Sequence, residues 1–559
     1  MPYVITQSCC NDASCVSVCP ANCIHPTPME PEFLTAEMLY IDPDTCIDCG
    51  ACADECPVGA AIDIDLLEAR QGRYEQINAD YYSDHDVLGG LLQHVRQPKL
   101  DGELSVAVVG AGPAAFYAAA ELSKHRTVRI DMFDRLPTPY GLVRAGVAPD
   151  HLSTKQVQDG FAATAAGGSF EYFLGAEVGT DITHDELAQR YTAVLYASGA
   201  SHDRRLGVPG EDLAGSIPAT EFVDWYNGHP DRADRDFDLS CERVVVVGNG
   251  NVALDVARIL CLGPDELHAT DIGEHAIETL QRSRVREVVV LGRRGVAQAA
   301  YTLSEFMALA ELKDVDIVID PDDLVLDDAT ARAEADGTLD SVLRMKISLA
   351  REFASRDLTG ASRRIVFRYL SAPAELVGDD AVAGVRCARN EYVTGGGGTV
   401  TSTDDDLVLD AGLVIRAIGY RGVPIPGLPF DETRAIVPNS AGRVERSPGE
   451  PERGVYVAGW IKRGATGGIG VNRWCGEETA RTIVADFAEG LLPDPVAART
   501  DIPDLLAARG VRRVDCDGWN RIDAAELAAG RERGRPRLKL VRREDLYATA
   551  GGAGIQVPL

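Results

Sequence analysis

Residues 104–124 read LSVAVVGAGPAAFYAAAELSK. The apolar run at the start predicts a buried strand, the glycines predict a tight turn, and the alanine-rich end predicts a helix. The segment TVRIDMFD at 127–134 is a second apolar run that ends in an acid. Strand, glycine turn, helix and strand in this order indicate a βαβ unit of a parallel sheet.

The same order recurs later in the chain. Residues 242–260, ERVVVVGNGNVALDVARIL, repeat the strand, turn and helix, and REVVVLGRR at 286–294 supplies the next strand. Further buried strands ending in glycine are expected within 413–422 and 454–464. Since strands that suit the first unit reappear after the second, we expect one α/β domain to be inserted into another.

The first glycine turn has the pattern of a dinucleotide site. Gly110 and Gly112 allow a tight turn and close approach of a pyrophosphate, and Ala115 is tolerated at the third position. The helix that follows offers free N–H groups and a favourable dipole. Asp134 ends the next strand at the spacing of the acid that binds a ribose hydroxyl, which favours FAD or NAD over NADP.

The second glycine turn, around Gly248 and Gly250, has the same pattern but a different partner strand. That strand ends in Arg293 and Arg294 instead of an acid. Guanidinium groups can pair with a 2′-phosphate, which a carboxylate would repel. The second site therefore favours NADPH over NADH.

Nine of the 14 cysteines fall within residues 9–56. Such dense cysteines in a presumed cytosolic chain indicate metal or redox sites rather than disulfides. The run Cys46-x2-Cys49-x2-Cys52-x3-Cys56-Pro has the spacing of a bacterial ferredoxin, in which three thiolates bind one cluster and the fourth binds the other. Cys19 also precedes a proline. The expected [4Fe–4S] ligands are Cys19, Cys46, Cys49 and Cys52.

The other half of the motif, Cys9-Cys10-x4-Cys15-x3-Cys19, is irregular. It resembles the seven-iron ferredoxins, whose first cluster is [3Fe–4S], and that resemblance implies Cys9, Cys15 and Cys56 as ligands. The gap from Cys9 to Cys15 is two residues shorter than usual, so two alternatives stay open. In the first alternative, Cys10 takes the place of Cys9 as a ligand. In the second, Cys9 and Cys10 both serve as ligands of a second [4Fe–4S] cluster. Cys23 is expected to be a free thiol packed near a cluster.

The size and charge of the chain exclude several classes. Its 559 residues suggest roughly three to four domains. The net charge of −31 argues against nucleic acid as a partner, because phosphates would be repelled. No apolar run reaches the roughly 18–20 residues that span a bilayer, and the first residues lack the features of a signal peptide. We expect a cytoplasmic protein without membrane contact.

The charge is distributed unevenly. Residues 1–66 contain eleven Asp or Glu and no Lys or Arg, whereas the run RERGRPRLKLVRR at 531–543 contains seven Lys or Arg. Docking of the acidic module on this basic run is one interpretation, since opposite charges attract at contact. A solvated basic stretch is the other.

Four long motifs carry a family resemblance: PYGLVRAGVAPDH (139–151), GNGNVALDVARIL (248–260), GRRGVAQAAYTLSE (292–305) and AGWIKRGATGGIG (458–470). They resemble adrenodoxin reductase and its bacterial ferredoxin–NADP reductase relatives, over roughly residues 104–550. Together with the cysteine module, the whole chain resembles the actinobacterial FprB-type ferredoxin/ferredoxin–NADP reductase fusions.

This resemblance implies a multidomain fold. An α+β bacterial ferredoxin-like module precedes an α/β, glutathione-reductase-like FAD domain that contains an inserted α/β NADP-binding domain. The expected segments are 1–66 for the iron–sulfur module, 67–103 for a connector with some helix, 104–205 and 412–490 for the FAD domain, 206–411 for the NADP domain, and 491–559 for a C-terminal extension that packs on the reductase.

The resemblance also implies roles for individual residues. The expected FAD contacts are Gly110, Ala111, Gly112, Ala115, Asp134, Gly141 and Leu142. The expected NADPH contacts are Gly248, Asn249, Gly250, Asn251 and Val252 at the pyrophosphate, and Arg293, Arg294 and Glu305 at the 2′-phosphate end. The candidate catalytic residues are Trp460 and Gly467 near the flavin ring and nicotinamide, and Arg144 and His151 in a polar cluster near the flavin. Some relatives carry a second acid three residues after Glu305, where this chain has Ala308.

The implied activity is electron transfer. NADPH gives a hydride to FAD, and FAD passes single electrons to an iron–sulfur cluster and on to an acceptor protein such as a ferredoxin or a P450. Two alternatives remain: an electron supplier like the glutamate-synthase small subunit, and a non-enzymatic redox sensor or carrier.

Overall fold

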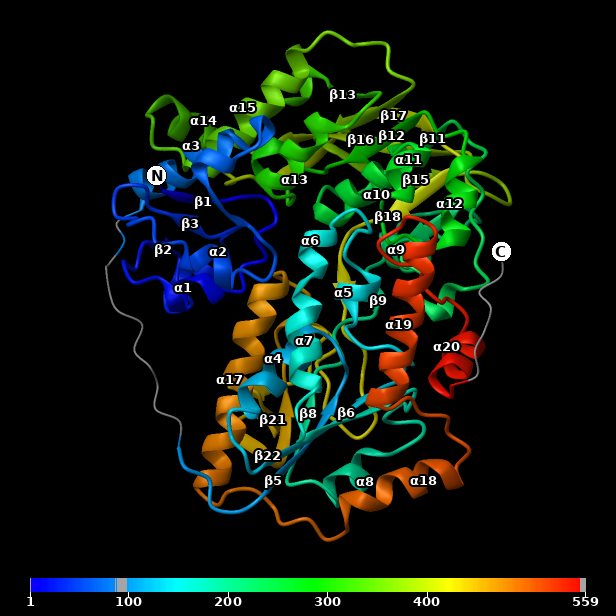
Figure 1. Cartoon of the computed structure of the whole chain (residues 1–559). Helices are drawn as coiled ribbons and strands as arrows, with labels where there is room; N and C mark the ends of the chain where they lie inside the picture. Colours follow the sequence, from blue (N-terminus) through cyan, green and yellow to red (C-terminus); the bar gives the residue numbers. More distant parts are fainter. Residues whose placement is uncertain (1, 86, 88–97, 553–559) are drawn as a thin grey trace.

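The computed structural model describes residues 2–85, 87 and 98–552. Residues 2–85 form an N-terminal module, which lies beside a larger reductase part, residues 98–552 (Figure 1). The elements of the module are the antiparallel strand pairs β1 (Tyr3–Ile5) with β4 (Ala61–Asp63) and β2 (Ile24–His25) with β3 (Tyr40–Ile41), and the helices α1 (Ser14–Val18), α2 (Ala51–Glu55) and α3 (Arg73–Asp84).

Helix α3 is an integral part of the module. The Asn78 side chain on this helix accepts hydrogen bonds from the backbone N–H groups of Ile5 and Ile41 and donates one to the Ile5 carbonyl. The expected connector at 67–103 is therefore wrong in its first part, because a buried amide ties α3 to strands β1 and β3. Of the rest of that segment, residues 86 and 88–97 lie outside the described residues.

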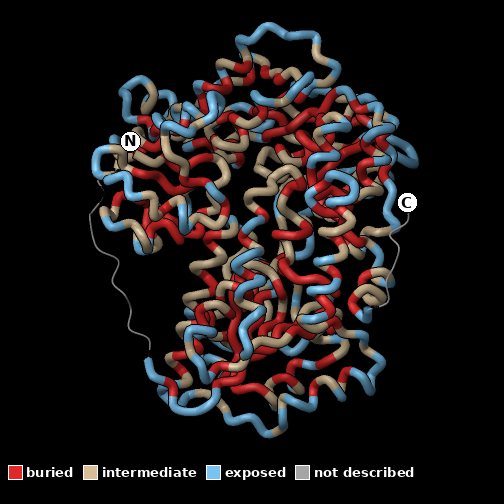
Figure 2. The backbone as a smooth tube through the Cα atoms, in the orientation of Figure 1, coloured by how far each residue is buried: buried red, intermediate tan, exposed pale blue. Residues whose placement is uncertain are grey.

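The first large sheet has seven strands in the order β20-β21-β22-β8-β5-β6-β7. Its middle strands β5, β6 and β8 consist mainly of buried apolar residues, and buried residues are concentrated in the core around them (Figure 2). Its strands are β5 (Leu104–Val109), β6 (Val128–Asp134), β7 (Phe170–Leu174), β8 (Ala193–Tyr196), β20 (Asn439–Ser440), β21 (Arg443–Ser447) and β22 (Glu450–Val457). Helices α4 (Pro113–Leu122) and α17 (Ile469–Ala488) pack against each other beside this sheet. Since β22 pairs in parallel with β8, the chain leaves this sheet and returns to it, as an inserted domain requires.

The second large sheet has six parallel strands in the order β10-β18-β11-β12-β14-β13. Its strands are β10 (Ser216–Pro218), β11 (Arg243–Val247), β12 (Glu287–Leu291), β13 (Val315–Ile319), β14 (Arg363–Arg368) and β18 (Leu413–Arg416). The expected boundary at 412 is wrong, because β18 pairs with β10 and β11 of this sheet and not with the first sheet. The apolar run of β18 is suited to any buried parallel strand, so its composition cannot assign it to one sheet.

The remaining elements cover or connect the two sheets. The strands are β9 (His202–Asp203), which pairs with β19 (Tyr420–Arg421), and the meander β15 (Ser371–Val377), β16 (Gly384–Tyr392) and β17 (Val400–Asp410). The helices are α5 (Leu142–Ala145), α6 (Leu152–Lys155), α7 (Val157–Ala165), α8 (His184–Ala188), α9 (Ala219–Tyr226), α10 (Asn251–Cys261), α11 (Pro264–His268), α12 (Glu274–Gln281), α13 (Leu303–Ala308), α14 (Asp328–Ala335), α15 (Ser341–Ser355), α16 (Trp460–Arg463), α18 (Ile502–Ala508), α19 (Cys516–Glu532) and α20 (Arg543–Ala550).

The C-terminal segment turns back onto the reductase through α19 and α20. Much of the basic run at 531–543 is buried there. Arg537 pairs with Glu526, Arg535 pairs with Glu274, and Lys539 pairs with Asp271, with nitrogen–oxygen distances of 2.8, 2.6 and 3.0 Å. Arg535, Arg537 and Lys539 are therefore neither solvated nor available to the acidic module, whereas Arg531, Arg533 and Arg542 of the same run are exposed. Residues 553–559 of the expected extension lie outside the described residues.

Candidate functional site: two thiol groups and two nucleotide turns

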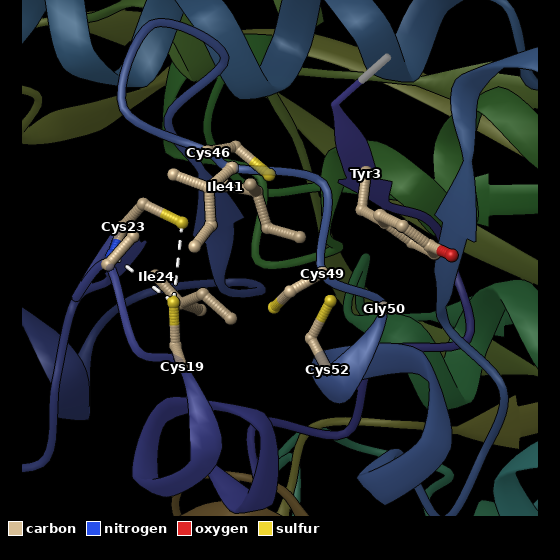
Figure 3. Close-up of a pocket in the computed structure, with 11 residues that line it drawn as sticks. Tyr3, Cys19, Cys23, Ile24, Ile41, Cys46, Cys49, Gly50 and Cys52 are labelled. Carbon is tan, nitrogen blue, oxygen red and sulfur yellow. Dashed lines mark hydrogen bonds between the residues drawn. The ribbon is translucent and has the colours of Figure 1, made fainter.

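Four of the predicted cluster ligands surround one pocket. Cys19, Cys46, Cys49 and Cys52 line it (Figure 3): Cys19 ends α1, Cys46 and Cys49 lie in the loop between β3 and α2, and Cys52 is on α2. Cys23 lies in the same pocket, with its Sγ 3.4 Å from that of Cys19. A set of four thiols is the donor chemistry of a [4Fe–4S] cluster, so these residues fit that group. We call them the outer thiol group.

The backbone explains why the ligands can converge. Gly50, between Cys49 and Cys52, has a left-handed φ of 74° and caps the N-terminus of α2. Ala13 has the same role before α1, with a φ of 59°. Cys19 and Cys56 are the extended C-caps of α1 and α2, so the two halves of the motif repeat one geometry. This repeat is what the two cysteine–proline pairs indicated.

The remaining predicted ligands form a second set. Burial raises the pKa of Cys9 to about 12 and also raises the pKa values of Cys10 and Cys15. The neighbouring Cys56 raises the pKa of each of these three thiols further. Buried thiolates are stable only beside a compensating cation, and iron would supply one. We call Cys9, Cys10, Cys15 and Cys56 the inner thiol group. Cys9 and Cys10 both belong to it, so the choice between them stays a prediction.

The first glycine turn has space for a pyrophosphate. Gly110 has a φ of 102°, and a Cβ there would lie 2.5 Å from the Ala197 carbonyl oxygen. A Cβ on Gly112 would meet no atom within 4 Å, and no side chain caps the helix α4 that begins there. The backbone also brings the next motif to this turn, because the Tyr140 N–H donates to the Ala111 carbonyl and Gly141 lies against Gly112. Leu142 begins α5 directly afterwards, and Ala115 is buried in α4.

Asp134 lies at the end of β6, as the spacing predicts. Its two carboxylate oxygens accept hydrogen bonds from the backbone N–H groups of Ala111 and Leu136, both at 2.8 Å. Burial raises its pKa. The Asp134 carboxylate therefore holds the backbone of the glycine turn in place. Its contact with a ribose stays a prediction.

The residues expected near the flavin ring lie together. The Trp460 indole N–H donates to the Gly467 carbonyl at 3.3 Å, and the Trp460 ring lies 5.2 Å from that of Tyr420. Gly467 is exposed and has a φ of 73°. It directly precedes helix α17, whose N-cap is Gly468.

The second glycine turn is built like the first. Gly248 has a φ of 116°, and Gly250 caps α10 without a side-chain hydrogen bond. Asn249 and Asn251 bind the segment at 301–302: the Asn249 carbonyl accepts from the Tyr301 N–H, and the Asn251 side chain accepts from the Thr302 N–H. Val252, in the first turn of α10, is partly buried.

The arginines that follow β12 are available for a phosphate. Arg293 is exposed and Arg294 is half-buried. Their backbone carbonyls accept hydrogen bonds from the Asn390 side chain and the Leu370 N–H, which fixes this turn. Among the residues that the structure describes, neither the Arg293 nor the Arg294 guanidinium forms an ion pair with an acid.

Glu305 makes different contacts from those two arginines. Its carboxylate lies 3.2 Å from Arg258 and 3.7 Å from the His151 Nε2 atom. Arg258 also pairs with Asp150 at 2.6 Å and with Asp255 at 2.7 Å, and it is only 5% exposed. Sequence reasoning missed Arg258. The available signal was the i, i+3 spacing of Asp255 and Arg258 within a mainly apolar helix of the second motif.

The acids near His151 are not arranged for a metal ion. His151, Asp255 and Glu305 lie close enough to share one. The Arg258 guanidinium already binds all three, donating to the His151 ring nitrogen at 2.8 Å. A buried cation in this position would repel a metal, so the cluster is an arginine-centred network.

Arg144 has other partners than His151. Its guanidinium forms a bidentate pair with Glu526 of α19, at 2.9 and 2.6 Å, and lies over the Trp519 ring. The two residues predicted to share a polar cluster therefore belong to different networks. Sequence reasoning missed Glu526, which lies far along the chain in a segment without a motif.

The comparisons with known proteins agree with this geometry. Residues 104–297 match the family model described as pyridine nucleotide-disulphide oxidoreductase, and residues 39–62 match the 4Fe-4S binding domain. No helix among the described residues has the length and apolar character needed to cross a bilayer.

Relatives match both the whole chain and its reductase part. A probable ferredoxin/ferredoxin–NADP reductase of Mycobacterium tuberculosis is 48% identical over 570 residues, covering 99% of this chain and 96% of that protein. The NADPH-ferredoxin reductase FprA of the same organism is 45% identical and covers 79% of this chain and 98% of that protein. The structure of FprA in complex with NADPH superposes with a TM-score of 0.74 at 43% identity, covering 80% of this chain and all of FprA. The chain therefore belongs to the family of ferredoxin/ferredoxin–NADP reductases, with an FprA-like FAD and NADP reductase and an N-terminal 4Fe-4S ferredoxin domain.

Proposed function

We infer that this protein is a ferredoxin–NADP⁺ reductase that takes electrons from NADPH and delivers them, through FAD and its own iron–sulfur module, to an acceptor protein. The observation that carries the proposal is the contact between the module and the reductase part. The Gly470 N–H on α17 donates to the Cys10 carbonyl of the inner thiol group at 2.8 Å. The loop of the inner thiol group thus contacts helix α17, which begins just after the predicted flavin residue Gly467.

Each nucleotide turn would have a separate task. The turn at Gly110–Ala115 would bind FAD, with Trp460 and Gly467 near its ring. The turn at Gly248–Val252 and the arginines after β12 would bind NADPH, as its relative FprA does. FAD accepts a hydride from NADPH and can release its two electrons one at a time. It can therefore connect NADPH, which donates two electrons, to clusters that each accept one.

The outer thiol group would bind a [4Fe–4S] cluster. For the inner thiol group we propose a [3Fe–4S] cluster held by Cys9, Cys15 and Cys56, with Cys10 as an alternative ligand. Support comes from the incomplete cysteine spacing, which leaves this half of the motif without the usual loop of three cysteines. The acceptor would be a soluble ferredoxin, a P450 or a similar protein.

The test is anaerobic titration with NADPH, followed by iron and sulfide analysis and EPR. We expect bleaching of FAD, then reduced-cluster signals, and steady reduction of cytochrome c through the clusters. Seven irons with a [3Fe–4S] signal in the oxidised protein are expected for the proposed pair of clusters. Full FAD with no turnover would support a redox sensor instead, and fewer than four irons would contradict the cluster assignment.

A further inference from the structure

We propose that Arg473 of helix α17 is a positioning residue that holds the inner thiol group against the flavin end of the reductase and turns the outer thiol group towards solvent. The proposal rests on the function inferred above and adds an order to it: the inner group is the entry point for electrons and the outer group is the exit.

Arg473 joins the module to the reductase through the loop that follows Cys10. Its Nη1 atom donates to the Asp12 carboxylate at 3.0 Å and to the Ser14 hydroxyl at 2.5 Å. Asp12 is only 9% exposed, and the two residues are 461 positions apart in the chain. A half-buried pair of this kind is poorly screened by solvent, so it resists separation better than an exposed pair.

Helix α17 also holds Arg473 in place from its other side. Its Nε atom donates to Glu477, one turn further along, at 2.9 Å, and its guanidinium lies 5.8 Å from the Tyr117 ring centre. Tyr117 is on α4, the helix that begins at the first glycine turn. These contacts hold the Arg473 side chain from within the reductase part, which is the property expected of a positioning residue.

Backbone contact makes the docking close. The Gly470 N–H donates to the Cys10 carbonyl, and a Cβ on Gly470 would overlap the Asn11 carbonyl oxygen. Only glycine allows this approach. Gly470 lies three residues after Gly467, so the inner thiol loop touches the same helix start that is expected to face the flavin ring.

The outer thiol group is on a different side of the module. Cys49 is exposed, and the neighbouring Ile47 is 63% exposed. Cys10, in contrast, is in direct contact with α17. The contact of Cys10 with α17 and the exposure of Cys49 together favour entry of electrons at the inner group and exit at the outer group.

The module has a second contact, which provides the control. On the NADP side, Glu37 accepts from Lys346 and from the Leu303 N–H, and Arg73 pairs with Glu352 at 3.0 Å. The Arg73 and Glu352 side chains are 49% and 38% exposed. Arg73→Ala therefore removes an ion pair at the module boundary without touching α17.

The experiment compares Arg473→Ala, Arg473→Lys and Arg73→Ala in the full-length protein. After rapid mixing with NADPH, flavin bleaching reports on the reductase, and the later absorbance and EPR changes report on the clusters. Hydrogen exchange of residues 9–15 and of the Gly470 amide reports on docking. Iron content and flavin absorbance are measured for each variant.

For Arg473→Ala we expect unchanged flavin bleaching, unchanged iron, faster exchange at 9–15 and cluster reduction slowed by about tenfold to a hundredfold, since small misplacements of reacting groups have effects of that size. Arg473→Lys should restore part of the rate, because it keeps the charge but not the fork of donors. Arg73→Ala should behave like the parent protein. Gly470→Ala is the second variant, and it should slow cluster reduction in the same way.

Cluster reduction and exchange in Arg473→Ala that equal those of the parent would overturn the proposal. Loss of iron from that variant would also overturn it, because Arg473 would then support cluster assembly instead of position. Failure of NADPH to reduce the clusters in the parent protein would refute the proposed function alone, since the exchange comparison still tests the docking.

Discussion

Arg293 and Arg294, directly after β12 and beside the second glycine turn, are the predicted contacts of the 2′-phosphate of NADPH. A charge-assisted hydrogen bond contributes roughly 1.5–3 kcal/mol. We therefore expect Arg294→Ala to raise the KM for NADPH about tenfold to a hundredfold and to leave the KM for NADH unchanged. Steady-state reduction of ferricyanide with each nucleotide measures both values. An equal rise for NADH would show that the arginine acts on the fold and not on the phosphate.

Cys49 and Cys23 share one pocket but have different predicted roles. Cys49→Ser should abolish the [4Fe–4S] cluster, because it removes one of four ligands, whereas Cys23→Ala should retain the iron. Iron analysis and EPR of the reduced proteins separate the two variants. Iron loss in Cys23→Ala, with iron retained in Cys49→Ser, would exchange the roles of the two cysteines.

Asp224 on α9 should make stability depend on pH. Burial raises its pKa to about 7, whereas an unfolded chain gives about 3.9. The folded state thus binds the proton more tightly, which stabilises it at low pH, and this contribution is lost as the pH rises from about 4 to about 7. Urea unfolding measures the free energy of unfolding of the parent and of Asp224→Asn. From about pH 4 to about pH 7, this free energy should fall in the parent relative to the variant. A difference that is constant with pH would contradict the assignment.

Helix α19 shows what the C-terminal segment contributes at the scale of an element. Its Glu526 side chain accepts from Arg144 and Arg537 and from the Leu540 N–H, so one buried carboxylate joins the motif at 139–151 to the end of the chain. This arrangement fastens α19 to helix α5, which carries Arg144.

Removing the Glu526 carboxylate should therefore loosen the whole element. Breaking a buried ion pair by removing one partner costs about 3–5 kcal/mol. We expect Glu526→Ala to lower the free energy of unfolding by that amount, and Glu532→Gln, at the exposed end of α19, to change it by less than about 0.5 kcal/mol. Denaturant unfolding followed by flavin fluorescence measures both. Equal stability of the two variants would show that α19 is held by apolar packing alone.

At the scale of the whole molecule, the N-terminal module is docked on the reductase part of the same chain. It touches the first sheet's helix α17 and, through Glu37 and Arg73, the second domain as well (Figure 1). A tethered and docked partner is present at a high effective concentration whatever the protein concentration.

Reduction of the clusters by NADPH should accordingly be first order and independent of protein concentration. Because the contacts include a backbone hydrogen bond and a half-buried ion pair, moderate salt should change the rate little. Stopped-flow measurements across protein and salt concentrations test both statements. A rate that rises with protein concentration would mean that electrons pass between molecules.

Apolar runs, glycine turns and cysteine spacing determined the elements that depend on neighbours in the sequence. The strands β5, β6, β11 and β12, the two glycine turns and the grouping of Cys46, Cys49 and Cys52 follow from local pattern, since turn geometry and side-chain period act over a few residues. Tertiary structure decided the rest. The sheet that takes β18, the pairing of Arg144 with Glu526 and the docking of Cys10 on Gly470 join residues tens to hundreds of positions apart. Such contacts depend on which surfaces meet when the chain is compact, and no local pattern of residues encodes that.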